Sequence, residues 1–108
     1  MQPDTRLLEK LVQRIVEAVH PLRIILFGSA ARGEMGPNSD LDVLVVMPDG
    51  IHRRETAQLI YRHLRGLGFA TDVVVVTQSD VAQYASNPYM LINPALEEGK
   101  ELYHATAQ

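Results

Sequence analysis

Apolar side chains recur at helical spacing in two parts of the 108-residue chain. Residues 4–19 carry them at i, i+3 and i+4 positions, which predicts a helix with one buried stripe that ends before Pro21. The same spacing over 51–66 predicts a second amphipathic helix, stopped by Gly66 and Gly68. The first stripe comprises Leu8, Leu11, Val12, Ile15, Val16 and Val19, and the second comprises Ala57, Ile60, Leu64 and Leu67.

Three short apolar runs that are rich in β-branched residues predict strands. They are LRIILF at 22–27, LDVLVVM at 41–47 and ATDVVVVT at 70–77. Because helices and strands follow one another along the chain, the order predicts an α/β (α+β) fold. We expect a small mixed β-sheet with helices packed against it.

Shorter elements are expected in the remaining segments. GSAARG at 28–33 has the composition to open a short helix after the first strand. Ser79 or Asp80 is a candidate N-cap for a short helix that runs through 81–85. The stretch 89–103 is expected to form one or two helical turns, followed by a brief strand or an extended end.

Composition narrows the class of protein. With 46% hydrophobic residues, the chain can build one core, so we expect a single domain over 1–108. A net charge of −3 and a pI near 5.7 argue against a broad nucleic-acid surface. The absence of Cys excludes disulfides and thiolate metal sites. Without a secretory leader or an apolar run of membrane-spanning length, we expect a cytoplasmic protein with no membrane partner.

Two carboxylates open the second predicted strand. Asp40 and Asp42 are separated by one residue, so a strand places both side chains on one face. Like charges beside a hydrophobic sheet are costly unless a cation lies between them. Oxygen ligands without Cys or clustered His favour Mg²⁺ or Mn²⁺, bound as one ion or two. If the third strand pairs beside the second, Asp72 completes a cluster of three acids.

The turn after the first strand has the chemistry of a phosphate site. Gly28 allows a ligand to approach the backbone closely, and Ser29 adds a hydroxyl donor near the start of the predicted short helix. Arg32 follows within one helical turn and can reach the same anion. A phosphate cradle that faces a carboxylate and metal cluster is the equipment for nucleotidyl or phosphoryl transfer.

These residues together resemble a known signature. Gly-Ser, ten intervening residues and Asp-Leu-Asp is similar to the motif of the DNA polymerase β-type nucleotidyltransferase superfamily. The fuller run, Gly-Ser-x-Ala-Arg-Gly and then Ser-Asp-x-Asp, resembles its minimal nucleotidyltransferase (MNT) branch. The matching positions are Gly28, Ser29, Ala31, Arg32, Gly33, Ser39, Asp40 and Asp42.

The resemblance implies a fold, an activity and a partner. It implies a polymerase β-like domain that binds a nucleoside triphosphate with two Mg²⁺ ions and moves the nucleoside monophosphate to an acceptor. MNT proteins are commonly antitoxins paired with a helical HEPN toxin, and transfer of AMP from ATP to a tyrosine of that toxin is attributed to them. Larger relatives carry an additional acceptor-binding domain, for which 108 residues leave no room, so the expected acceptor is a docking protein.

Specific residue roles carry over from the family to this sequence. Asp40 and Asp42 would hold the metals, and Asp72 would bind the second metal or act as base for the attacking hydroxyl. The triphosphate would be held by Gly28, Ser29, Arg32 and Ser39.

Plainer interpretations exist for several of these residues. Asp40, Asp42 and Asp72 are also compatible with solvated acids near strand ends. Ser29 can cap a helix and bind phosphate with the same geometry, and Arg32 can pair with a surface acid such as Glu34.

The helix faces have two interpretations as well. The arginines of the second helix form either a solvated face or a docking surface for an acidic partner; they are Arg53, Arg54, Arg62 and Arg65. The apolar face of the first helix is core or, in part, a subunit interface, which leaves a homo-oligomer open.

A different class of function also remains open. In it, the domain is a non-catalytic, nucleotide-binding antitoxin that neutralises its partner by occlusion.

Overall fold

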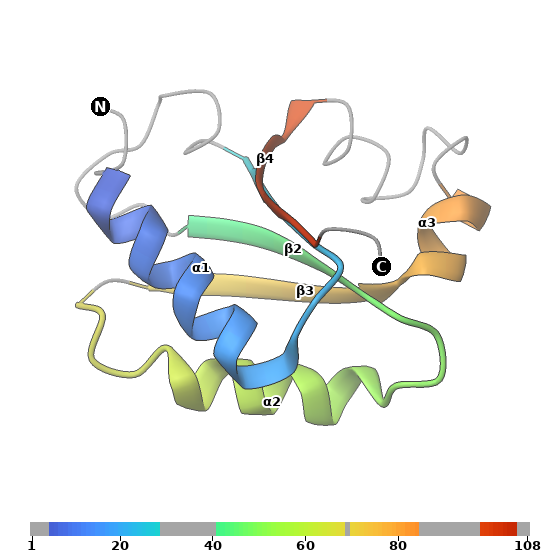
Figure 1. Cartoon of the computed structure of the whole chain (residues 1–108), viewed down its shortest axis with the longest axis horizontal. Coiled ribbons are helices and arrows are strands. Elements are labelled where there is room, and N and C mark those ends of the chain that lie inside the picture. Colours follow the sequence, from blue (N-terminus) through green and yellow to red (C-terminus); the bar gives the residue numbers. More distant parts are fainter. Residues whose placement is uncertain (1–4, 29–40, 69, 85–97, 106–108) are drawn as a thin grey trace.

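A four-stranded mixed sheet forms the centre of the molecule (Figure 1). A computed structural model describes residues 5–28, 41–68, 70–84 and 98–105. The elements in chain order are α1 (Thr5–Val19), β1 (Arg23–Phe27), β2 (Leu41–Met47), α2 (Arg53–His63), β3 (Thr71–Thr77), α3 (Gln78–Tyr84) and β4 (Lys100–His104). The strand order is β3-β2-β1-β4, with β2 and β3 parallel and the other pairs antiparallel. The predicted mixed α/β fold is confirmed.

The two long helices cover one face of the sheet. Leu11 and Ile15 of α1 and Ile60 of α2 are fully buried in a cluster with alternate residues of β1 and β2. The intervening strand residues face the other side, where Ile25, Leu44, Val46 and Val76 form a smaller buried cluster. Successive side chains of the central strands therefore point alternately into two apolar layers. Because both faces are buried, the strand sequences are continuous hydrophobic runs.

The predicted strands and the first helix agree closely with the structure. β2 has the predicted bounds, while β1 and β3 each begin one residue later than the apolar run. The second helix is shorter than 51–66, because the His52 Nδ1 atom accepts a hydrogen bond from the Glu55 N–H and caps α2 at its start. Its predicted stop is confirmed, since Gly66 has a positive φ of 87° just beyond the last turn.

The cap of α3 differs from both candidates named above. The Asp80 N–H donates to the Thr77 hydroxyl at 3.1 Å, and the Thr77 N–H donates to the Asp80 carboxylate at 3.0 Å. This reciprocal capping box makes Thr77, the last residue of β3, the residue that starts the helix. Ser79 instead donates from its N–H and its hydroxyl to Asp49.

One arginine of α2 has a structural role. Arg53 donates to both carboxylate oxygens of Asp80, at 2.9 and 2.8 Å, and so joins the start of α2 to the start of α3. It is therefore not simply part of a solvated face. Arg54, Arg62 and Arg65 are exposed.

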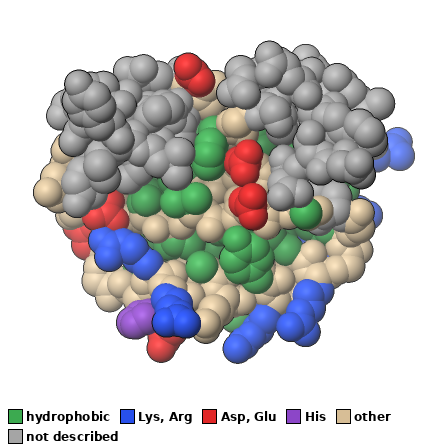
Figure 2. Space-filling view, turned by 180° about the vertical axis from the view of Figure 1, so that it is seen from behind, with side chains coloured by type: hydrophobic (Ala, Val, Ile, Leu, Met, Phe, Trp, Pro, Cys, Tyr) green, Lys and Arg blue, Asp and Glu red, His purple; other side chains and the backbone are tan. Residues whose placement is uncertain are grey.

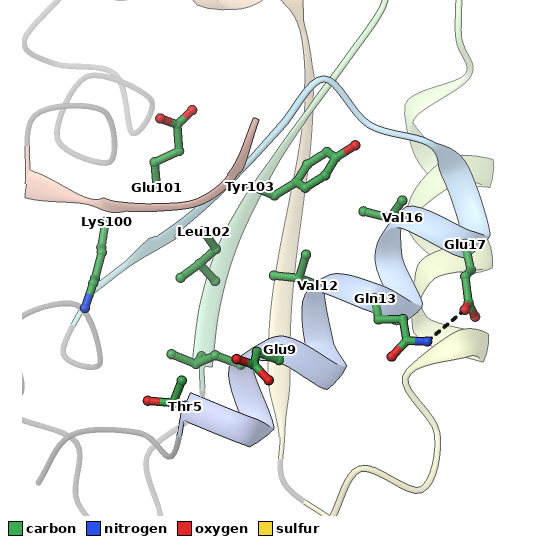
Figure 3. A pocket seen from close by; sticks show the side chains of 11 residues that line it. Thr5, Glu9, Val12, Gln13, Val16, Glu17, Lys100, Glu101, Leu102 and Tyr103 are labelled. Carbon is green, nitrogen blue, oxygen red and sulfur yellow. Dashed lines mark hydrogen bonds between the residues drawn. The ribbon is translucent and has the colours of Figure 1, made fainter. Parts of the chain in front are cut away.

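A groove of about 670 Å³ lies between α1 and β4 (Figure 3). A β-bulge between Ile24 and Ile25 in the β1–β4 pairing lets two adjacent residues, Leu102 and Tyr103, both pack toward α1. Val12 and Val16 face them from α1. The apolar face of α1 is thus core along one edge and groove wall along the other. Within the described ranges, no helix combines the length and apolarity needed to span a lipid bilayer.

The predicted elements over 28–33 and 89–99 fall largely on residues that the structure does not describe. The tail of the chain forms β4, in agreement with the expected brief strand.

The capping box predicts an acid-sensitive contribution to stability. The Thr77 N–H, assisted by Arg53, lowers the pKa of Asp80 below its ordinary value of 3.8. Because the folded-state pKa is the lower one, this stabilisation is present above the unfolded pKa and is lost as the pH falls through the folded pKa. We expect Asp80→Ala to lower the free energy of unfolding by about 1 to 2 kcal/mol at neutral pH.

Urea unfolding measured from neutral pH to about pH 2 tests this. The Asp80→Ala variant should lose less stability on acidification than the wild type. Glu9→Ala, on the exposed side of α1, is the control and should behave like the wild type. Equal acid sensitivity in all three proteins would contradict the assignment.

Candidate functional site

Three side chains form a row across the sheet on the face opposite the two long helices. Phe27 of β1 pairs with Asp42 of β2, and Asp42 pairs with Asp72 of β3. Directly paired residues of neighbouring strands share a face. Leu41 and Val43, the chain neighbours of Asp42, belong to the cluster beneath the helices, so Asp42 points away from them.

The sheet therefore brings the two carboxylates together. Neighbouring strands lie about 4.8 Å apart, and Asp42 and Asp72 are Cα partners in the parallel register. Asp42 is half-buried and Asp72 is exposed. On this face, acidic side chains lie among hydrophobic ones (Figure 2). The predicted pairing of the third strand beside the second, on which a cluster with Asp72 depended, is found.

Gly28 fits closely against Asp42. It has a φ of +74°, a backbone conformation that residues other than glycine rarely adopt. A Cβ atom at this position would lie 2.5 Å from the Asp42 Oδ2 atom. Glycine is thus required twice at the end of β1, once for the backbone turn and once for the space that the carboxylate occupies.

Four of the predicted site residues lie outside the described part of the chain: Ser29, Arg32, Ser39 and Asp40. The structure places neither the predicted phosphate-binding hydroxyls nor the first aspartate of the pair. Among the residues that it does describe, no group of three acidic or histidine side chains could hold a metal ion. Asp42 and Asp72 supply oxygen donors. Because Gly28 has no side chain, the Asp42 carboxylate has space at the end of β1. This donor chemistry fits Mg²⁺ or Mn²⁺.

Two acids near the start of α3 have lowered pKa values with structural causes. Hydrogen bonds from Ser79 lower the pKa of Asp49, and the Thr77 N–H lowers that of Asp80. Both residues are at the opposite end of the β2–β3 pair from Asp42 and Asp72. At Asp49 and Asp80, the lowered pKa therefore reflects a loop contact and a helix cap.

Comparison with known proteins assigns the family. Residues 7–98 match the family model of the nucleotidyltransferase domain. The chain belongs to this family. The resemblance read from Gly28 through Asp42 is therefore confirmed at the level of the family.

Proteins similar to this nucleotidyltransferase domain include a bifunctional enzyme and two toxin–antitoxin complexes. The bifunctional uridylyltransferase/uridylyl-removing enzyme of Burkholderia thailandensis is 32% identical over 89 residues, which is 80% of this chain and 10% of that enzyme. The domain thus spans about a tenth of the length of this relative. Two crystal structures of toxin–antitoxin complexes superpose with a TM-score of 0.65, each covering 91% of this chain and 73% of theirs.

The solved complexes establish the fold of the nucleotidyltransferase domain. One contains AMP-PNP and is 24% identical to this chain. The other, named MntA-HpeT, is a mutant with two aspartates changed to glutamate and is 22% identical.

The close approach of Gly28 to Asp42 gives a test with a matched control. Gly28→Ala and Gly50→Ala both place a side chain at a positive φ, and each should cost about 1 to 2 kcal/mol of unfolding free energy. A Cβ at Gly50 meets nothing within 4 Å, whereas a Cβ at Gly28 displaces the Asp42 carboxylate. The carboxyl ¹³C resonance of Asp42 should shift only in Gly28→Ala. An unchanged resonance would show that the carboxylate does not need this glycine.

Proposed function

We propose that the domain transfers a nucleoside monophosphate, AMP from ATP, to a hydroxyl group of a partner protein. We also propose that this transfer makes it the antitoxin of a helical HEPN-type toxin. The observation that carries the proposal is the in-register pair of Asp42 and Asp72, beside the positive-φ turn at Gly28. Membership of the nucleotidyltransferase family supports the reaction class.

The proposed roles of Asp42 and Asp72 follow their positions in the sheet, and that of Asp40 follows the family resemblance. Asp40, Asp42 and Asp72 hold two Mg²⁺ ions, which when bound neutralise the acids and the charge that builds on the reacting phosphate. Asp42, on an interior strand with β1 and β3 on either side, provides the fixed ligand. Asp72 is exposed at the edge of the sheet, where an acceptor can reach it.

The reaction would proceed by displacement at the α-phosphorus. Gly28, Ser29, Arg32 and Ser39 hold the triphosphate. The acceptor oxygen forms a bond to the α-phosphorus while the bond to the bridging α–β oxygen breaks, and pyrophosphate leaves. The proton of the acceptor hydroxyl passes to Asp72 and then to water.

The solved neighbours support a nucleotide and a protein partner. The two structures that superpose with a TM-score of 0.65 are toxin–antitoxin complexes, and one holds AMP-PNP, an ATP analogue. The other carries Asp-to-Glu substitutions at two positions separated by one residue. That spacing equals the spacing of Asp40 and Asp42 in this chain.

Removal of the central carboxylate tests the reaction. We expect Asp42→Ala to reduce transfer of label at least about 100-fold, because it removes a ligand of the metal ions that stabilise charge in the transition state. The variant should still fold. The assay incubates the protein with Mg²⁺, the candidate toxin and α-³²P-labelled ATP or UTP in parallel. The two nucleotides are compared because one relative is a uridylyltransferase.

Asp49→Ala is the matched control, since Asp49 is an exposed acid beyond the other end of β2. It should transfer label at the wild-type rate. Equal labelling by Asp42→Ala and wild type would refute the catalytic assignment.

The occlusion alternative has a separate test. The double variant Asp40→Ala/Asp42→Ala is mixed with the toxin in an inhibition assay. If the proposal holds, this variant binds the toxin but fails to neutralise it. Full neutralisation by the variant would favour occlusion by a non-catalytic antitoxin.

A further inference from the structure

β3 is the edge strand of the described sheet, and it carries Asp72 next to its start. An edge strand pairs on one side only, so alternate backbone N–H groups face outward. The N–H of Val73, the residue after Asp72, donates to the Tyr61 hydroxyl at 2.9 Å. A side chain of α2 therefore takes the place of a neighbouring strand at this position.

Tyr61 is held firmly on the helix that carries it. Its chain neighbour Ile60 is fully buried beneath α2. Arg14 of α1 donates to the carbonyl oxygens of His63 and Arg65, at 3.3 and 2.8 Å, and anchors the end of α2. The Tyr61 hydroxyl thus acts from a fixed platform, although the residue as a whole is 43% exposed.

We propose that Tyr61 is a positioning residue for Asp72. It clamps the edge strand so that the Asp72 carboxylate stays opposite that of Asp42. This inference rests on the proposed function, in which both acids bind the same divalent cations. Asp42 needs no such clamp, because β2 is paired on both sides, with β1 and with β3.

The exposure of Tyr61 is consistent with this role. A large aromatic residue that is 43% exposed gains little from burial, whereas its hydroxyl occupies the acceptor position beside the edge strand. Leu59, on the same helix, is 37% exposed and provides a comparison residue.

The test removes the hydroxyl and retains the ring. In Tyr61→Phe, amide hydrogen exchange at Val73 should become faster. Affinity for Mn²⁺, measured by calorimetry without nucleotide, should fall by about 2- to 10-fold, the effect of one hydrogen bond. Leu59→Ala should leave both measurements at the wild-type values.

A double-mutant cycle separates positioning from general stability. Asp72→Asn alone should weaken Mn²⁺ binding more than Tyr61→Phe does, and adding Tyr61→Phe to it should have no further effect on affinity. An additive loss would overturn the inference, as would unchanged Mn²⁺ affinity in Tyr61→Phe. Mn²⁺ binding that Asp72→Asn leaves intact would instead contradict the metal site of the proposed function, so the two failures are distinguishable.

Discussion

The parallel pairing of β2 with β3, with Asp42 opposite Asp72, decides where the chemistry of this domain lies. A slip of one residue would turn Asp72 toward the face covered by α1 and α2, into an apolar cluster. The strand itself specifies this register weakly, because four consecutive valines, 73–76, present the same side chain to both faces. Polar contacts at the two ends of β3 help to specify the register that the valines leave open. Thr77 is tied into the capping box of α3, and the Val73 N–H is bonded to Tyr61.

The two ends of the β2–β3 pair use carboxylates for different purposes. At the carboxyl end, Asp80 accepts from Thr77 and Arg53, and Asp49 accepts from Ser79, so these acids join loops and helix starts. Their lowered pKa values follow from those donors. At the amino end, Asp42 and Asp72 lie side by side on an apolar face, an arrangement that a divalent cation would stabilise. Carboxylates of similar sequence context thus differ in role because of the neighbours that tertiary structure gives them.

Sequence reasoning succeeded where burial alone determines the structure. Continuous apolar runs fixed the bounds of β2, and helical spacing located α1 and the buried side of α2, because those elements owe their stability to the core. It failed where a structure depends on which of several available hydrogen-bond partners a side chain binds. Ser79 and Asp80 have the usual composition of an N-cap, yet Thr77 takes that position because Asp80 reaches back to its N–H. Tyr61 carried no signal at all, since its bond to β3 exists only once α2 packs along the sheet edge. The motif residues Gly28 and Asp42 were found by their spacing, and the pairing of β1 with β2 brings them next to each other.

Asp42 and Asp72 differ in burial and in conformational freedom, which suits them to different roles in the proposed reaction. Asp42 is half-buried on an interior strand and is packed against Gly28, so its carboxylate has little freedom. Asp72 is exposed on an edge strand, and the backbone N–H of the next residue donates a hydrogen bond to a side chain of α2. A rigid acid suits a permanent metal ligand, whereas an accessible acid suits the residue that meets an incoming hydroxyl and takes its proton. In the proposed reaction the acceptor therefore approaches Asp72 from the face of the sheet opposite α1 and α2. On that face neither long helix lies over the two carboxylates, because α1 and α2 pack on the opposite side of the sheet.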